Sequence, residues 1–317
     1  MTRRITLGAI VAAAALLAST LPAAAITNGQ PDAGEHPFVG QLLFHVPDAT
    51  DPRFDSPGAW FTCTGTLMDD LTVLTAGHCV FGTGREGVTT TLPTGTMDPA
   101  GGTDVWISFA EVPDYSILPS SSSFAPAGNA ERYRAWSAAL DEDETWREAT
   151  AYAHPEYDDT AFFQHDLGVL VLDQAAPAGA TDAGFGEVAT LGLLDTLSRV
   201  KGQTFEPVGY GLEKSGPRTA EGGDTRRKAT STLVSLNGAF GLGKGVSAKF
   251  SNNNGRTHTG GTCFGDSGGP VFAGTDSRVI VAVTSYGISS TCAGSTGGYR
   301  VDQPDDLAFL AGFGVTP

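Results

Sequence analysis

Two short motifs that lie far apart in the chain carry the residue types needed for nucleophilic catalysis. Ser267 stands in the run GDSGGP at 265–270, and His78 stands in the run TAGHC at 75–79. A serine hydroxyl becomes a useful nucleophile when a histidine takes its proton, a carboxylate orients that histidine, and hydrogen-bond donors stabilise the oxyanion. The sequence supplies a candidate for each role, so these residues predict acyl-transfer chemistry at a serine.

The order of the candidate residues along the chain separates the known kinds of serine site. The motif also fits G-x-S-x-G, which in α/β-hydrolases requires the order Ser, acid, His. All six histidines precede Ser267, which excludes that order. The order acid, His, Ser would need an acid before His78, such as Asp69 or Asp70, and nothing around these two supports it. The order His, Asp, Ser is met by His78, Asp166 and Ser267, because Asp166 heads a long apolar run.

Five segments give the chain a resemblance to the chymotrypsin/trypsin family of serine proteases. In the family's order they are ITNG at 26–29, TAGHC at 75–79, DLGVLVL at 166–172, TCFGDSGGP at 262–270 and SYG at 285–287. The resemblance implies a secreted serine endopeptidase that acts on proteins or peptides and needs no cofactor or metal. It also implies an all-β fold of two antiparallel six-stranded barrels with a short C-terminal helix and the active site in the cleft between them.

The resemblance assigns catalytic roles residue by residue. His78 is expected to be the base, Asp166 the acid that orients it, and Ser267 the nucleophile. The backbone N–H groups of Gly265 and Ser267 are expected to hold the oxyanion, where the loss of one donor typically raises the barrier by about 3 kcal/mol. Ser285 is expected to help orient Asp166.

A neutral primary pocket is the expected basis of substrate choice. By the resemblance, Gly261 lies at the pocket base, where trypsin-like members carry an aspartate that captures Arg or Lys. The expected substrate-binding residues are Gly261, Thr262, Ser285, Tyr286, Gly287 and Gly297. This pocket is expected to favour bulky neutral side chains, aromatic or large aliphatic, unless an acid reaches it from an inserted loop.

The resemblance also implies an ion pair that activates the enzyme. In this family a newly freed amino terminus folds inward and pairs with the aspartate before the nucleophile. Here Ile26 and Asp266 match those positions. Because Ile26 directly follows the run AAA at 23–25, we expect signal peptidase itself to create the active terminus.

Residues 1–25 resemble an export signal, with Arg3 and Arg4, a short apolar stretch, and small residues before Ile26. The apolar stretch at 5–18 is too short for a membrane anchor, which needs about 20 residues. The arginine pair also leaves a twin-arginine route open. Removing residues 1–25 changes the net charge from -16 to -18, which argues against a nucleic-acid partner. We expect an extracellular monomer that does not bind membranes.

Four cysteines in an exported chain predict disulfides, with three pairings possible in principle. The resemblance selects Cys63 with Cys79 and Cys263 with Cys292. A metal site is the alternative for these cysteines, but the chain has no C-x-x-C pair to support one.

Short β-rich runs separated by turn residues predict the strands. The runs are 38–46, 60–68, 72–74, 105–109, 148–153 and 167–172 for the first barrel, and 188–194, 205–210, 226–234, 246–250, 271–272 and 279–286 for the second. Within one domain over 26–317, the barrels are expected at about 36–175 and 185–301, and the helix at about 304–311 with Asp302 as its N-cap. We interpret segments 82–102 and 113–143 as insertions relative to compact members of the family.

Two other functions remain open at this stage. One is a secreted binding protein built on an inactive protease scaffold, although such scaffolds usually lack a triad residue and none is missing here. The other is an esterase with little peptidase activity.

Overall fold

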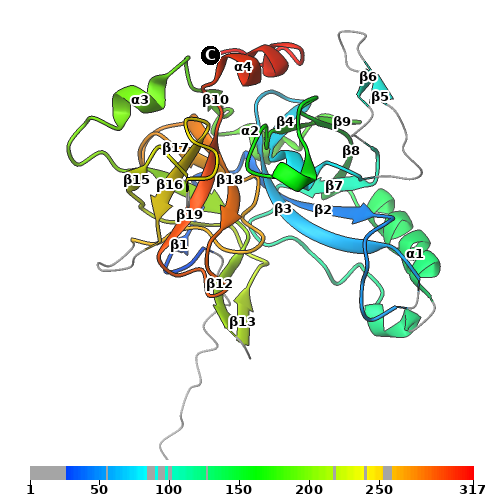
Figure 1. Cartoon of the computed structure of the whole chain (residues 1–317). Coiled ribbons are helices and arrows are strands. Elements are labelled where there is room, and N and C mark those ends of the chain that lie inside the picture. Colours follow the sequence, from blue (N-terminus) through cyan, green and yellow to red (C-terminus); the bar gives the residue numbers. More distant parts are fainter. Residues whose placement is uncertain are drawn as a thin grey trace, which may run out of the picture.

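Two β-structures form the body of the molecule and lie side by side in this computed structural model (Figure 1). The structure describes residues 26–54, 56–83, 90–91, 97–98, 102–125, 128–216, 219–238, 241–252 and 259–317. The expected export segment and most of the segment 82–102 lie outside the described residues. One hydrophobic core contains residues of both β-structures, so the two halves are packed against each other.

Six antiparallel strands close into a barrel in the first half, in the order β2, β3, β4, β9, β8, β7. Their bounds are β2 (Val39–Val46), β3 (Ala59–Leu67), β4 (Thr72–Thr75), β7 (Val105–Ser108), β8 (Trp146–Ala153) and β9 (Gly168–Leu172). Each strand agrees with the sequence prediction to within two residues at either end. The agreement follows from their apolar composition, because the inward side chains of a small barrel must fill its interior.

The second half is a nine-stranded sheet that curls into a half-barrel. Its strands are β1 (Gln30–Pro31), β10 (Glu187–Val188), β11 (Glu206–Gly209), β14 (Arg227–Lys228), β15 (Leu233–Ser235), β16 (Ser247–Ser251), β17 (Pro270–Phe272), β18 (Val279–Gly287) and β19 (Ser295–Arg300). The expected all-β architecture is confirmed, but this half is not a closed barrel of six strands. The path ends at β1 and β15, and β10 pairs parallel to β18. Strands of two or three residues offer few ladder hydrogen bonds with which to close the sheet.

Two predicted strands of the second half are wrong in their extent. Instead of one strand over 188–194, β10 ends at Val188 and the short helix α3 (Leu193–Leu197) follows. Gly192, just before that helix, has a φ of 69°, a left-handed conformation that interrupts extended chain and favours glycine. The predicted strand 226–234 likewise divides into β14 and β15.

The C-terminal helix α4 (Pro304–Ala311) forms where the sequence predicts it, but Asp302 is not its cap. Gln303 is the N-cap residue and makes no side-chain cap bond. Asp302 is fully buried and instead accepts hydrogen bonds from the Leu194 N–H and from Arg300 Nε, both at 2.8 Å. Its carboxylate therefore ties α3 to the end of β19.

The expected insertion at 113–143 contains a helix, α1 (Asn129–Glu142), that the sequence analysis did not predict. Its buried Arg132 pairs with Asp51 at 3.0 Å, and the guanidinium lies 4.1 Å from the centroid of the Phe54 ring. These contacts fasten the insertion to the loop that follows β2, so it is an ordered part of the first half.

The remaining elements are short. They are α2 (Ala178–Thr181), α3 (Leu193–Leu197), the 3₁₀ turns η1 (Gly77–Cys79), η2 (Ser121–Phe124) and η3 (Asp159–Ala161), and the hairpins β5 (Thr90–Thr91) with β6 (Met97–Asp98) and β12 (Leu212–Gly216) with β13 (Thr219–Gly222). Among the helices of the described ranges, none is long and apolar enough to cross a membrane.

Candidate active site

Strand pairing in the first barrel brings His78 and Asp166 together. β4 and β9 pair antiparallel, with Thr75 opposite Gly168. His78 follows β4 within η1, and Asp166 precedes β9, so both residues leave the barrel at the same edge. The register of these two buried strands therefore sets the contact between the imidazole and the carboxylate.

The carboxylate of Asp166 contacts both the backbone N–H and the imidazole ring of His78. The His78 backbone N–H donates to Oδ1 at 2.8 Å, and Nδ1 lies 3.0 Å from both carboxylate oxygens. Asp166 is fully buried, whereas the His78 side chain is 27% exposed. Burial lowers the pKa of His78, but its attraction to the Asp166 carboxylate outweighs this and holds the pKa above 6.5. With Nδ1 occupied, Nε2 is the nitrogen left to take a proton from another group.

Ser285 supports Asp166 from the second half of the molecule. Its hydroxyl, on strand β18, donates to Oδ2 of Asp166 at 2.5 Å. Asp166 thus receives hydrogen bonds from both halves, which fixes the plane of its carboxylate.

A tight turn holds Ser267 where the two halves meet. Gly268 has a φ of 77°, and a Cβ there would lie 2.0 Å from the Thr75 hydroxyl, so the turn requires glycine. The Thr64 N–H donates to the Ser267 carbonyl at 2.7 Å. Ser267 and His78 line the same cleft, although no hydrogen bond joins their side chains within the described part of the chain. Such bonds often tighten only when substrate binds.

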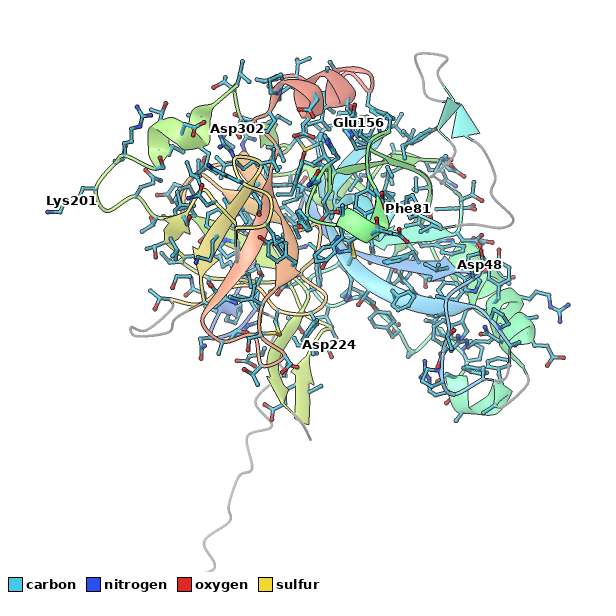
Figure 2. The ribbon with its side chains drawn as sticks, viewed as in Figure 1. Asp48, Phe81, Glu156, Lys201, Asp224 and Asp302 are labelled. Atoms are coloured by element: carbon cyan, nitrogen blue, oxygen red, sulfur yellow. A yellow bond between two sulfur atoms is a disulfide. The ribbon has the colours of Figure 1, made fainter. Side chains whose placement is uncertain are left out.

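The cleft that holds His78 and Ser267 has a volume of about 640 Å³. Four aromatic side chains line it, namely Phe44, Phe61, Phe81 and Tyr157. Two carboxylates, Asp48 and Asp159, also belong to its lining, and Figure 2 labels Phe81 and Asp48 on the side of the first barrel. A cleft at this position was expected, but its aromatic and acidic lining residues were not, because they come from separate segments that share no motif.

The backbone beside Ser267 offers two amide groups to an oxyanion. The Leu212 N–H donates to the Phe264 carbonyl at 2.8 Å, and the two ends of a trans peptide point in opposite directions. The N–H of Gly265 is therefore turned away from Leu212, and Gly265 adopts a φ of 97°. Among the described residues, neither the Gly265 N–H nor the Ser267 N–H donates to a protein acceptor.

A pocket of about 210 Å³ opens next to Ser267. Its lining residues are Thr262, Cys263, Phe264, Ser267, Thr284, Ser285, Tyr286, Gly287, Cys292 and Thr296. Four of the expected substrate-binding residues are present in this set, and no residue of the set carries a charged side chain. The pocket thus has room for a side chain, and the described residues that line it offer no counter-charge to a cationic one.

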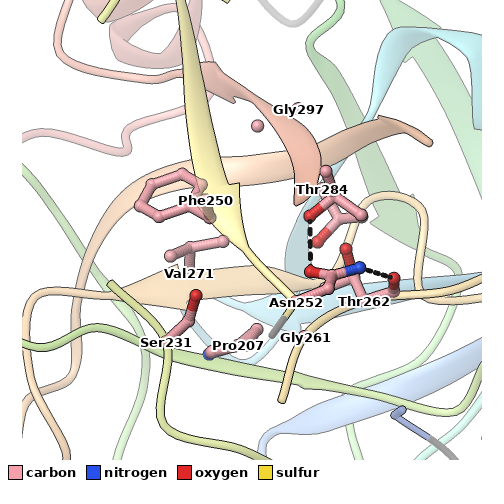
Figure 3. Close-up of a pocket in the computed structure, with 11 residues that line it drawn as sticks. Pro207, Ser231, Phe250, Asn252, Gly261, Thr262, Val271, Thr284 and Gly297 are labelled. Atoms are coloured by element: carbon pink, nitrogen blue, oxygen red, sulfur yellow. Dashed lines mark hydrogen bonds between the residues drawn. The ribbon is translucent and has the colours of Figure 1, made fainter. Parts of the chain in front are cut away.

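Gly261 and Gly297 are not among the residues that line this pocket. They line a separate, much smaller cavity of about 10 Å³ (Figure 3). A Cβ on Gly297 would lie 2.2 Å from the Tyr286 ring, so that ring covers it. Thr296 lines the pocket instead and pairs with Gly287, because the ladder between β18 and β19 shifts register between Thr284 and Tyr286. No feature of the sequence signals that shift.

Asn252 occupies the space beside Gly261. Its Nδ2 donates to the Thr262 carbonyl at 2.8 Å, and its Oδ1 accepts from the Thr296 hydroxyl at 3.2 Å (Figure 3). Nδ2 also donates to the Cys292 carbonyl at 3.0 Å. A fully bonded amide therefore closes the deep end of the region that the sequence analysis assigned to Gly261. The sequence analysis missed Asn252, which begins the plain polar run NNN at 252–254.

Asp266 is completely buried beside Ser267, and the described residues contain no cation paired with it. Its carboxylate accepts hydrogen bonds from the N–H groups of Gly211 at 2.7 Å and Cys263 at 2.8 Å. Burial raises the pKa of Asp266 to about 7, although both amides oppose the shift. The ionised form of Asp266 therefore has no balancing positive charge among the described residues to offset the burial that raises its pKa.

The segment that begins at Ile26 is docked on the second half. Ile26 is fully buried, and the next residue, Thr27, exchanges backbone hydrogen bonds with Gly261 at 2.9 and 3.2 Å. The preceding residues, 1–25, lie outside the described part of the chain.

Both disulfides flank the site in the pairing that the resemblance implied. Cys63 is bonded to Cys79 beside His78, and Cys263 is bonded to Cys292 in the wall of the pocket. Because these sulfurs are bonded to each other, they are not available as thiolate ligands for a metal next to His78.

Comparisons with known proteins agree with this architecture. A family model described as Trypsin matches residues 128–303, more than half of the chain. That segment contains Asp166 and Ser267, while His78 precedes it. The fold is similar to that of HL collagenase, with a TM-score of 0.60, 15% sequence identity, and coverage of 92% of this chain and 100% of that chain. No curated protein matches the chain. The chain belongs to the trypsin family and is a serine-type endopeptidase.

Proposed function

We propose that this protein is a secreted endopeptidase that cleaves peptide bonds through His78, Asp166 and Ser267. The observation that carries the proposal is the bonding of Asp166, which orients His78 at 3.0 Å and is itself fixed by Ser285 at 2.5 Å. The imidazole so oriented shares one cleft with Ser267. A merely structural histidine would not need a buried carboxylate and an open cleft together.

Catalysis would proceed through an acyl-enzyme. As Ser267 Oγ attacks the carbonyl carbon, Nε2 of His78 takes the hydroxyl proton, and the N–H groups of Gly265 and Ser267 stabilise the oxyanion. The intermediate collapses when His78 gives that proton to the leaving amine, which breaks the C–N bond. A water molecule then attacks the ester as His78 takes its proton, and His78 gives that proton to Ser267 Oγ as the acyl C–O bond breaks, which frees Ser267.

The primary pocket favours a neutral side chain. The 210 Å³ space has no charged lining residue, and a buried unpaired cation there would carry a large desolvation penalty. Three threonines, Thr262, Thr284 and Thr296, line both this pocket and the small cavity behind it. They limit the depth of the pocket, so aliphatic side chains of moderate size fit this site best, while Gly287 leaves its rim open to substrate backbone.

The active form would begin at Ile26, after removal of residues 1–25 on export. Its ammonium would pair with Asp266, the buried carboxylate that has no cation among the described residues. The processed protein would be a monomer with one domain over residues 26–317. The inactive-scaffold and esterase alternatives predict different behaviour in a digest.

Digestion of a peptide library by the purified protein, with mass spectrometry of the products, tests the proposal. We expect cuts in many peptides by the wild-type protein and none by Ser267→Ala. Hydrolysis of activated esters without peptide cleavage would favour the esterase, and no hydrolysis at all would favour the inactive scaffold.

A further inference from the structure

A cluster of imidazoles and carboxylates lies next to Asp166 in the chain but outside the active-site cleft. His154 and His165 come from the segment between β8 and β9, and Asp305 and Asp306 come from the first turn of α4. One side-chain nitrogen or oxygen from each of these four residues lies within 4.8 Å of the others. The sequence analysis predicted no metal, because these residues form no contiguous motif.

We propose that His165, Asp305 and Asp306 bind one zinc ion that fastens the segment before Asp166 to the C-terminal helix. Nδ1 of His165 lies 3.2 Å from Oδ2 of Asp305. Two neighbouring ligands of one zinc ion, each bonded at about 2.1 Å, are separated by about 3.0 to 3.4 Å. Nδ1 is buried and makes no hydrogen bond with any residue that the structure describes, so its lone pair is available to a metal.

The surroundings of these residues fit the outer shell of a metal site. Nε2 of His165 lies 3.3 Å from a carboxylate oxygen of Glu156, the arrangement that fixes the tautomer of a metal-binding histidine. The Tyr299 hydroxyl donates to Asp306 at 3.0 Å. Both partners hold their residues without competing for the proposed ligand atoms of His165 and Asp305.

His154 belongs to the outer shell and is not a ligand. Its Nδ1 accepts the Glu156 N–H at 3.2 Å, so the neutral ring carries its proton on Nε2. That nitrogen lies 4.0 Å from Oδ1 of Asp306, which is too far for a hydrogen bond. The protein therefore supplies three ligands.

Charge and exposure also favour a bound dication. Glu156, Asp305 and Asp306 gather three carboxyl groups, and within the described ranges their only ion-pair partners are the two histidines. Asp306 is fully buried, whereas Asp305 is 45% exposed, which leaves an open side for water ligands. A mixed set of imidazole and carboxylate suits Zn²⁺, while Ca²⁺ and Mg²⁺ prefer oxygen ligands alone.

The proposed zinc ion would help to position the triad residue Asp166 through the backbone of its neighbour His165. His165 has a φ of 49°, an uncommon conformation for a residue with a side chain, and Asp166 is its neighbour. A metal bond to the ring would hold this conformation and thereby the position of Asp166. The ion would touch no substrate, so its role would be structural.

Calorimetric titration of the EDTA-treated full chain with ZnCl₂ tests the proposal. All proteins carry Ser267→Ala, which prevents self-digestion and makes the result independent of the proposed function. We expect one zinc ion per chain and a melting temperature that rises on binding. Asp305→Asn, and His165→Asn, whose asparagine tolerates a positive φ, should each weaken binding by about 100-fold or more, and Glu156→Gln by about 10-fold to 100-fold.

Two control variants show where zinc binds. Asp276→Asn changes an exposed aspartate far from the proposed site in the sequence, and His78→Ala removes the histidine of the active-site cleft, so both variants should bind zinc as the parent does. The proposal fails if the parent binds no stoichiometric zinc, if His78→Ala abolishes binding, or if His165→Asn and Asp305→Asn bind zinc with unchanged affinity.

Discussion

Oδ1 of Asn252 lies where residue 261 would place a side chain, since a Cβ built on Gly261 would meet that oxygen at 1.8 Å. The same amide bonds the carbonyls of Thr262 and Cys292. Glycine at 261 and asparagine at 252 therefore form a matched pair that closes the floor behind the primary pocket. An aspartate introduced at 261 would collide with Asn252 before it could meet a basic substrate.

This pair predicts a coupled effect on stability. Gly261→Ala should lower the free energy of unfolding by about 1 to 3 kcal/mol, because the added methyl group overpacks the site. In an Asn252→Ala background the same change should cost clearly less. Urea unfolding of the four proteins in a Ser267→Ala background measures the coupling, and Gly274→Ala, where a Cβ meets nothing within 4 Å, is the matched control. Costs that add to within about 0.5 kcal/mol would show that the two sites are independent.

The pocket walls predict substrate choice. Most cuts in a digested protein mixture should follow neutral aliphatic side chains, and Thr296→Ala should raise kcat/KM for larger neutral residues by about tenfold, the effect of roughly one methylene in a pocket. Mass spectrometry of the products, followed by kinetics on matched peptides, checks both statements. A majority of cuts after Arg or Lys would mean that an acid enters the pocket from a loop.

The environment of His78 predicts the pH dependence. A base works only when unprotonated, so activity should rise with pH through the pKa of His78, which Asp166 holds above 6.5. Asp166→Asn removes that attraction, so the midpoint should move to lower pH while kcat falls by about 10⁴-fold, the effect known for this triad. The pH profile of kcat/KM for both proteins is the measurement. A flat wild-type profile between about pH 5 and 8 would be inconsistent with a base at His78.

The buried carboxyl of Asp266 predicts a difference between two forms of the chain. Its pKa of about 7 lies above the ordinary 3.8, so the folded form holds this proton more tightly and loses stability as pH rises from about 4 to 7. We expect that loss, at most about 1.4 kcal/mol per pH unit, in a chain with residues before Ile26. A chain that begins at Ile26 should lack it, because the new ammonium would stabilise the carboxylate.

Urea unfolding at several pH values between 4 and 7 compares the two forms, again with Ser267→Ala. Asp266→Asn in the extended chain should abolish its share of the pH dependence. Identical pH dependence in the extended and processed forms would argue against the ion pair.

Local patterns were enough to predict the first barrel, because its strands are apolar runs bounded by turn residues. The same holds for α4 and for the motifs around His78, Asp166 and Ser267. The sequence could not show the pocket floor, because that floor depends on a register shift beside Tyr286 and on the side chain of Asn252, the residue that follows β16. Such relationships exist only after distant strands have paired.

The helix α1 and the histidine cluster illustrate the same limit. The polar stretch 129–142 lacks a strong apolar face and is held by contacts such as that of Arg132 with Asp51, 81 positions away. In the sequence, His165 is simply the residue before Asp166. Its contact with Asp305 arises only when α4 packs beside it in the folded chain. Long-range contacts of single side chains carry no local signal.

The central claim is that Ser267, activated by His78, is the nucleophile. Incubation of the active protein with a serine-directed phosphonate, followed by peptide mapping in the mass spectrometer, tests it most directly. The account predicts one label per chain, on Ser267, together with complete loss of activity, and no label on Ser267→Ala or His78→Ala. A label on a different residue that abolishes activity, or full activity in Ser267→Ala, would contradict it.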